Sequence, residues 1–154
     1  EVNNISVART AVGEINVVNK MNEIGSELGG EGNGGVILRE CHLGRDSLVG
    51  ATMVLNRMSQ TENSLGKIHQ LLPQFEIVKD KVDLDGIDSD TLIQKVQSLF
   101  HDADTNTLDG VKFTWADRWV HLRNSNTEPI MRIYAEAVNK LEANKLVNQI
   151  RSCI

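Results

Sequence analysis

The sequence predicts an α/β fragment over residues 1–60, followed by a separate α+β domain over residues 74–154. The first part reads as strand, helix, glycine-rich loop, strand and helix, an order that is typical of α/β packing. In the second part, apolar residues alternate with polar ones in short runs between residues 111 and 135, as expected for strands with one buried face. Pro73 ends a polar stretch between the two parts, so we assign residues 61–73 to a linker.

The first part contains two predicted helices around a glycine-rich segment. Apolar residues at helical spacing predict a helix over residues 13–28, which runs into the loop Gly29–Gly35. Val36–Leu38 is a short apolar run and is predicted to be a strand. Asp46 or Ser47 is expected to cap the next amphipathic helix. Because this part has only about half the length of a typical α/β domain, we expect further residues of the domain upstream.

The second part is predicted to follow a short connecting helix over residues 62–72. A strand extends from Phe75 to Leu84, and Asp88 or Ser89 caps the helix after it. The elements expected next are three strands and a last helix, around Val111–Trp115, Val120–Leu122, Met131–Ala135 and Ala143–Ile150. This order predicts one antiparallel sheet with its helices on one face.

Composition limits the classes of partner. The formal net charge is -5, so no overall basic field attracts nucleic acid or an anionic membrane, and any anionic ligand must be held by local groups. The sequence has no run of about 18 apolar residues and no signal-peptide pattern. Cys41 and Cys153 lie far apart and form neither a metal-binding nor a redox pair. We therefore expect a cytoplasmic protein with no nucleic-acid or membrane partner.

The loop Gly29–Gly35 is a candidate ligand-binding loop. It holds five of the 12 glycines in seven positions, which lets the backbone approach a ligand closely. Its two other residues, Glu31 and Asn33, carry a carboxylate that accepts hydrogen bonds and an amide that both donates and accepts. These groups suit neighbouring sugar hydroxyls better than a phosphate. A flexible turn that only joins a helix to a strand is the alternative.

A second candidate loop follows Arg123. Arg123, Ser125, Asn126 and Thr127 lie within five positions between two predicted strands. A tight turn directs several backbone N–H groups into one concavity, and the planar arginine fork matches phosphate oxygens. Arg132 follows on the next strand and could reach the same anion. The alternative is a polar hairpin with a solvated arginine.

Both loops resemble those of one enzyme family. The stretch GGEGNGGVI at residues 29–37 is similar to the sugar-recognition loop in the third domain of the α-D-phosphohexomutases. The stretch RNSNTEPIMRIYAEA at residues 123–137 is similar to the phosphate-binding loop of their fourth domain. HLGRDSLVGA at residues 42–51 and RTAVGEINVV at residues 9–18 also resemble family sequence. The resemblance implies a C-terminal fragment, part of the third domain plus a fourth domain of TATA-binding-protein-like α+β fold.

The family comprises phosphomannomutases, phosphoglucomutases and phosphoglucosamine mutases. The resemblance implies that the full-length enzyme interconverts hexose 1-phosphate and hexose 6-phosphate through a phosphoserine and a hexose 1,6-bisphosphate intermediate, with Mg²⁺ as cofactor. No TASHNP-like serine loop and no DGDGDR-like aspartate cluster occurs in this sequence. We therefore expect no catalytic nucleophile and no metal ligand in this chain, which would be inactive without the N-terminal domains of the enzyme. A stand-alone phosphosugar-binding or regulatory module is the alternative.

The resemblance also assigns roles to single residues. It implies that Gly30, Glu31 and Asn33 bind the sugar, and that the non-reacting phosphate is held by Arg123, Ser125, Asn126 and Thr127. Arg132 is added to the phosphate site on its expected position more than on the motif. Gly35 stands where many family members have a histidine. The group that takes the hydroxyl proton is therefore open, with His42, Arg45 and Arg9 as candidates. Asn126 stands where phosphoglucosamine mutases often have glycine, which favours mannose or glucose phosphates, although the sequence does not decide the hexose.

Overall fold

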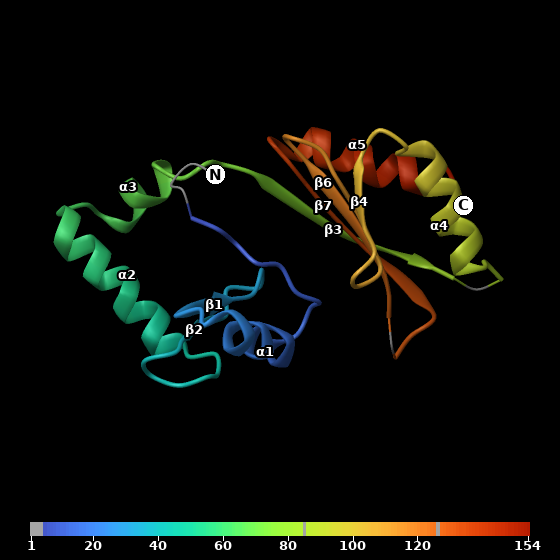
Figure 1. Ribbon diagram of the computed structural model, residues 1–154. Helices are drawn as coiled ribbons and strands as arrows, with labels where there is room; N and C mark the ends of the chain where they lie inside the picture. Colours follow the sequence, from blue (N-terminus) through green and yellow to red (C-terminus); the bar gives the residue numbers. More distant parts are fainter. Residues whose placement is uncertain (1–4, 85, 126) are drawn as a thin grey trace. The chain divides into compact units, whose positions relative to one another are not determined.

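The computed structural model describes residues 5–84, 86–125 and 127–154. The chain divides into two compact units, Glu1–Leu72 and Pro73–Ile154. Each unit has its own secondary structure, coloured from blue to green in the first and from green to red in the second (Figure 1).

The first unit contains, in its described part, a two-stranded antiparallel hairpin with one helix packed on each strand and a further short helix. Its elements are α1 (Glu14–Ile24), β1 (Leu28–Gly30), β2 (Val36–Leu38), α2 (Ser47–Thr61) and α3 (Leu65–Gln70). Asp46 caps α2 as predicted, because its carboxylate accepts hydrogen bonds from the backbone N–H groups of Leu48 and Val49 at 2.7 and 3.0 Å.

The predicted first helix was too long. Helix α1 ends at Ile24, because Gly25 adopts a left-handed conformation with φ of 67° and terminates it. Leu28, which was expected on the helix, instead begins β1 and pairs with Leu38. The glycine-rich segment therefore does not join a helix to a strand. Gly29 and Gly30 belong to β1, and the rest of the segment forms the turn of a β-hairpin.

Little of the first unit is buried. Met21 and Ile37 are its buried hydrophobic residues within the described part of the chain, and α2 has no buried residue. Leu48 and Leu55 on α2 are 76% and 63% exposed although they belong to its apolar face. The unit therefore needs a further apolar surface to complete its packing.

The second unit is a five-stranded antiparallel sheet with two helices. Its strands lie in the order β3-β7-β6-β5-β4. The elements are β3 (Glu76–Asp83), α4 (Ser89–Leu99), β4 (Asp104–Asn106), β5 (Val111–Thr114), β6 (Trp119–Asn124), β7 (Ile130–Ala137) and α5 (Lys140–Arg151). This architecture confirms the predicted sheet, although the edge strand β4 was not predicted.

One face of this sheet carries the core. Alternate strand residues such as Phe113, Leu122 and Ile133 are buried against Val96 of α4 and Ile150 of α5. Both helices therefore cover the same face, as predicted (Figure 1). Asp88 caps α4, since its carboxylate accepts from the backbone N–H of Thr91 at 2.9 Å.

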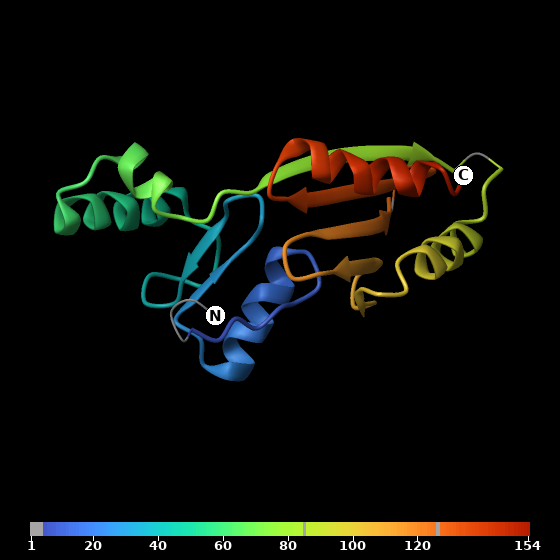
Figure 2. The same ribbon diagram turned by 90° about the horizontal axis from the view of Figure 1, so that it is seen from above.

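Within the described residues of the second unit, no helix covers the opposite face of the sheet. Because side chains alternate between faces along each strand, residues paired across the ladder share a face. The register pairs Lys81 with Arg132 and Arg132 with Arg123, so three cations form a row across β3, β7 and β6. The β6–β7 loop lies at one end of the sheet (Figure 2). The row is close to that loop, because Arg123 is the last but one residue of β6 and Arg132 is the third of β7.

Candidate functional site

The glycine-rich hairpin brings the predicted sugar-binding residues into one turn. The backbone N–H of Glu31 donates to the carbonyl of Gly35 at 3.0 Å, and that of Gly34 donates to the carbonyl of Glu31 at 3.0 Å. The side-chain oxygen of Asn33 accepts from the backbone N–H of Gly35 at 3.1 Å. Gly30 ends β1 directly before this turn. Backbone hydrogen bonds therefore fix the positions of Glu31 and Asn33.

Glu31 is also held by an ion pair that sequence reasoning did not foresee. Its side chain is only 12% exposed, and its Oε2 atom lies 2.9 Å from Nη1 of Arg45. Oε2 is shielded from solvent and has no partner with hydrogen-bond geometry within the described residues, so the contact with Arg45 is primarily electrostatic. Arg45 follows β2 in sequence and reaches back over the turn.

Arg45 bridges two carboxylates. Its Nε atom lies 2.8 Å from Oε2 of Glu14, at the start of α1, and its backbone N–H donates to Oε1 of the same residue at 3.0 Å. The hydrogen bond to Glu14, followed by the charge of Glu31, raises the pKa of Arg45 above its usual value. The backbone and side-chain hydrogen bonds from Arg45 lower the pKa of Glu14. A guanidinium with a raised pKa stays protonated, so Arg45 cannot take a proton from a hydroxyl.

His42 contacts a different acidic residue. The Nε2 atom of His42 is 3.1 Å from Oδ2 of Asp46, the cap of α2. This contact, after the backbone hydrogen bond from Val49, lowers the pKa of Asp46. Of the three candidate bases, Arg45 is the one that contacts the predicted sugar-binding residues in the described structure.

The β6–β7 hairpin brings together most of the predicted phosphate-binding residues. Arg123 near the end of β6 pairs across the ladder with Arg132 on β7. The backbone N–H of Ser125 donates to the carbonyl of Ile130 at 2.9 Å and closes the hairpin. The hydroxyl of Ser125 lies 3.4 Å from both the hydroxyl and the backbone nitrogen of Thr127. Asn126 lies outside the described residues, so its predicted role stays a prediction.

Arg123 has an acidic partner that the sequence did not reveal. Its Nε atom lies 3.2 Å from Oδ1 of Asp109, and the two side chains are 30% and 23% exposed. Asp109 lies in the connection between β4 and β5. The sequence signal at this position is the dipeptide Asp109–Gly110, which predicts a turn but not a partner for Arg123.

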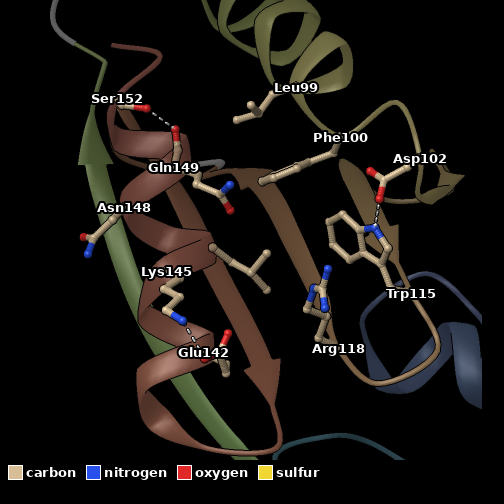
Figure 3. Close-up of a pocket in the computed structure, with 11 residues that line it drawn as sticks. Leu99, Phe100, Asp102, Trp115, Arg118, Glu142, Lys145, Asn148, Gln149 and Ser152 are labelled. Atoms are coloured by element: carbon tan, nitrogen blue, oxygen red, sulfur yellow. Dashed lines mark hydrogen bonds and ion pairs between the residues drawn. The ribbon is translucent and has the colours of Figure 1, made fainter.

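The helix-covered side of the sheet has a hollow of about 620 Å³ between α4, α5 and the segment around Trp115 (Figure 3). The indole Nε1–H of Trp115 donates to Asp102 at 2.9 Å and lowers the pKa of that carboxyl, while Arg118 stacks over the ring at 5.0 Å. Lys145, the other cation of the lining, pairs with Glu142 at 2.6 Å. None of the predicted site residues that the structure describes lines this hollow, and its cations already face acidic or aromatic partners.

Among the described residues, no group of three or more His, Cys, Asp and Glu side chains is arranged to hold a metal ion. No helix in the described part of the chain is long and apolar enough to cross a bilayer.

Comparison with known proteins identifies the family. Residues 1–75 match the domain described as phosphoglucomutase/phosphomannomutase, alpha/beta/alpha domain III. Residues 77–152 match the phosphoglucomutase/phosphomannomutase C-terminal domain. The chain belongs to the phosphoglucomutase/phosphomannomutase family. The resemblance drawn from the two loops is thereby confirmed, as is the predicted order of an α/β part followed by an α+β domain.

Relatives of this family member carry several mutase names. A phosphoglucosamine/phosphogalactosamine mutase from Sulfurisphaera tokodaii is 32% identical over 154 residues, covering 98% of this chain and 34% of that protein. A phosphoglucomutase/phosphomannomutase from Thermococcus kodakarensis is 32% identical over 145 residues, covering 93% of this chain and 32% of that protein. The chain thus spans about a third of the length of these relatives and contains their C-terminal domains.

A solved structure shares the fold of this family member. The crystal structure of a phosphoglucomutase/phosphomannomutase family protein from Burkholderia thailandensis matches 94% of this chain and 31% of its own chain, with a TM-score of 0.72 and 23% identity. At this level of identity, the likeness establishes the fold and not the substrate.

Proposed function

We propose that this chain is the C-terminal sugar- and phosphate-binding part of a phosphohexomutase, which interconverts hexose 1-phosphate and hexose 6-phosphate through a phosphoserine enzyme and a hexose 1,6-bisphosphate intermediate. The observation that carries the proposal is the match, in order, to the third and the C-terminal domain of this enzyme family. Two hairpin turns support it. The glycine-rich turn carries a carboxylate and an amide, and the β6–β7 turn is flanked by two arginines.

The phosphate site is formed by the β6–β7 hairpin. Arg123 and Arg132 face each other at the loop end of the open face and supply two positive charges. Ser125 and Thr127 add hydroxyl donors and loop amides, and Asn126 completes the set. A phosphate dianion suits this set of groups because it accepts several hydrogen bonds and carries the charge opposite to that of the two guanidinium groups.

The sugar site is formed by the glycine-rich hairpin. The carboxylate of Glu31 accepts hydrogen bonds from neighbouring sugar hydroxyls, with Asn33 and the backbone of Gly30 beside it. The ion pair with Arg45 restricts the carboxylate before a ligand arrives, which reduces the entropy lost on binding. Because Arg45 stays charged, the hydroxyl proton passes to a group other than Arg45.

These residues contribute to phosphoryl transfer by positioning. The transferred phosphoryl group needs an attacking oxygen held close to it and in line, and fixing both ends of the sugar phosphate supplies this alignment. The phosphate loop donates hydrogen bonds to a phosphate, and the sugar loop accepts hydrogen bonds from hydroxyls. Both sets of contacts can form when the sugar binds in either of two opposite orientations. The same loops could therefore serve before and after the bisphosphate intermediate turns round.

The remaining parts of the reaction centre belong to the preceding domains of the enzyme. We assign the phosphoserine and the Mg²⁺ ligands to those domains, and residues 61–73 to the linker between the sugar-binding part and the phosphate-binding domain. When bound there, Mg²⁺ would offset negative charge on the transferred phosphoryl group. Cys41 and Cys153 are unpaired thiols, which supports a cytoplasmic location.

The preceding domains also account for the incomplete packing of the first unit. Helix α2 presents exposed apolar side chains, and a complete domain III would cover them. This observation disfavours the alternative of a stand-alone phosphosugar-binding or regulatory module, which would need a closed surface of its own.

Calorimetric titration of the chain tests the binding part of the proposal. Glucose 1-phosphate, mannose 1-phosphate and glucosamine 1-phosphate are compared, each with the wild-type chain and with Arg123→Ala. We expect weak binding that Arg123→Ala abolishes, and the ranking of the three ligands identifies the preferred hexose. Unchanged binding by Arg123→Ala would contradict the assignment of the phosphate site.

A chimera tests the catalytic part. The chain is joined to the N-terminal two thirds of the Thermococcus kodakarensis relative, in place of that protein's own C-terminal third. We expect mutase activity from the chimera and none from the chain alone. Mutase activity of the chain alone would contradict the assignment of the nucleophile to the preceding domains.

A further inference from the structure

We propose that Asp109 is a positioning residue of the phosphate site, which holds the Nε side of Arg123 so that the outer Nη groups of the guanidinium face the bound anion. This inference rests on the proposed phosphate-binding role of Arg123. Asp109 lies 14 positions before Arg123, in the connection between β4 and β5, whereas Arg123 lies on β6, so the fold brings the two together.

The backbone next to Asp109 is pressed against strand β6. Gly110 has φ of +68°, a conformation that side chains other than glycine rarely adopt. A Cβ atom added to Gly110 would lie 2.2 Å from the carbonyl oxygen of Leu122 and 3.1 Å from Cα of Arg123. Only glycine permits this approach, and the approach places the carboxylate of Asp109 beside the arginine.

Two further contacts hold the same connection in place. The Nε2 atom of His121, on β6, forms a hydrogen bond with the backbone carbonyl of Asp109. The backbone N–H of Leu108 donates to the side-chain oxygen of Asn106 at 2.9 Å and orders the turn that precedes Asp109. The carboxylate is therefore presented to Arg123 from a backbone that is anchored on both sides.

The charges around Arg123 explain why an acid is needed there. Arg123 faces Arg132, which in turn faces Lys81, and like charges directly opposite each other on a sheet are destabilising. Asp109 offsets one of the three positive charges. Two net positive charges remain in the row, which matches a phosphate of about two negative charges near neutral pH.

The position of the contact on the guanidinium determines which nitrogen atoms of Arg123 are left to bind a phosphate. Asp109 contacts Nε at 3.2 Å, on the side of the group that lies nearest the strand. An arginine held at Nε loses fewer rotamers when its Nη groups bind a phosphate, because the fork is already oriented. Asp109 thus acts on the anion through Arg123 and does not itself touch it.

The first experiment measures the ligand-free chain, so its outcome does not depend on phosphate binding. The Nε–Hε signal of Arg123 is followed by ¹H–¹⁵N NMR and assigned by its loss in Arg123→Lys. In Asp109→Ala and Asp109→Asn we expect the chemical shift of this signal to change, because the charged carboxylate that lies 3.2 Å from Nε in the wild-type chain is gone. An unchanged signal in both variants would overturn the proposal.

The second experiment is a double-mutant cycle with inorganic phosphate as the ligand. Asp109→Ala is expected to weaken binding on the order of tenfold in the wild-type background, with Asp109→Glu recovering part of the loss. In the Arg123→Lys background the same change is expected to have less than about a twofold effect, because lysine lacks the planar guanidinium fork that Asp109 is proposed to orient. Equal losses in both backgrounds would mean that Asp109 acts through general stability, and would overturn the proposal.

The two experiments separate the inference from the proposed function. If Arg123→Ala leaves phosphate binding intact while Asp109→Ala still changes the Nε signal, the proposed role of Arg123 fails and the contact stands as a structural one. If Arg123→Ala abolishes binding and Asp109→Ala has no effect on it, the positioning role fails and the proposed function stands. Gly110→Ala supplies a further variant that moves Asp109 without removing it.

Discussion

The aliphatic part of Arg45 lies directly over Gly35, in the turn that carries Glu31. A Cβ atom added to Gly35 would lie 2.4 Å from Cδ and 3.0 Å from Cγ of Arg45. The guanidinium of Arg45 then extends to Glu31 and Glu14. Gly35 and Arg45 are therefore coupled, since the arginine occupies the space that any side chain at position 35 would need. The histidine that many family members have at this position is not compatible with Arg45 as it lies here.

Gly35→Ala tests this coupling. We expect the methyl group to displace Arg45, because it would lie 2.4 Å from Cδ of the arginine, closer than two carbon atoms can approach without a shift. Loss of the Glu31 ion pair should weaken binding of glucose 1-phosphate by severalfold, on the order of 1 kcal/mol or less. Binding of inorganic phosphate should not change, because it involves only the other loop. Calorimetry with glucose 1-phosphate and with inorganic phosphate therefore separates the change in affinity for the sugar from any change in affinity for the phosphate.

Gly32→Ala is the matched control for that substitution. Gly32 lies in the same turn, but an added Cβ atom would meet nothing within 4 Å. It should bind both ligands as the wild-type chain does. If Gly35→Ala and Gly32→Ala behave alike, the contact between Gly35 and Arg45 has no functional consequence.

Arg132→Gln should have opposite effects on binding and on stability. Removing the guanidinium takes away one of the charges proposed to hold the phosphate, so affinity for inorganic phosphate should fall. It also removes a like-charge neighbour of Arg123 and Lys81, so the second unit should gain about 0.5 kcal/mol in the free energy of unfolding at low salt. The gain should shrink as salt screens the charges.

Tryptophan fluorescence during thermal unfolding measures that stability, since both tryptophans of the chain, Trp115 and Trp119, lie in the second unit. Lys79→Gln is the control, because Lys79 projects from the same face but pairs with Tyr134, one row away from the phosphate loop. An Arg132→Gln chain that binds phosphate as tightly as Lys79→Gln would argue against a role for Arg132.

The strands of the second unit could be predicted from sequence because their apolar residues alternate. Val111 and Phe113 are buried on β5, and Val120 and Leu122 are buried on β6. Strand β4 could not be predicted, since Asp104–Asn106 are polar and exposed and join the sheet through backbone pairing alone.

The predicted end of the first helix was wrong because the prediction rested on periodicity alone. Leu28 lies four positions after Ile24 and continues the apolar helical spacing, so periodicity alone extends the helix. The left-handed conformation of Gly25 ends it, and a single glycine inside an apolar pattern does not by itself reveal which conformation it adopts.

The two ligand-binding loops could be predicted because the types of residue in them indicate what they bind. The residues that form ion pairs with the loops could not be predicted. Asp109 reaches Arg123 only because β5 and β6 are neighbours in the sheet. The contact between Arg45 and Glu31 likewise depends on how the segment after β2 folds back over the hairpin turn. Such pairs follow from strand order and loop path, which local sequence patterns do not specify.

Asp80 on β3 and Arg151 on α5 form a bidentate ion pair that joins the edge strand to the last helix. The Nε and Nη2 atoms of Arg151 lie 2.8 and 2.9 Å from the two carboxylate oxygens. The hydrogen bonds from Arg151 lower the pKa of Asp80, and Asp80 raises the pKa of Arg151. Because the pKa of Asp80 is lower in the folded chain than in the unfolded one, the pair stabilises the folded state when Asp80 is ionised.

The sign of the pH dependence follows from that shift. The stabilisation is fully present above the unfolded pKa of about 4 and is lost as the pH falls through the lower, folded value. Asp80→Asn should therefore lower the free energy of unfolding of the second unit by about 1 kcal/mol at pH 7, a modest value because the pair is partly exposed. Towards pH 2 the difference between Asp80→Asn and the wild-type chain should disappear.

Urea unfolding followed by tryptophan fluorescence at several pH values measures this difference. Asp83→Asn serves as the control, because Asp83 lies on the same strand and has no ion pair within the described part of the chain. Its effect on stability at pH 7 should be small. A loss of stability in Asp80→Asn that stays constant between pH 7 and pH 2 would mean that the ionised carboxylate is not what joins β3 to α5.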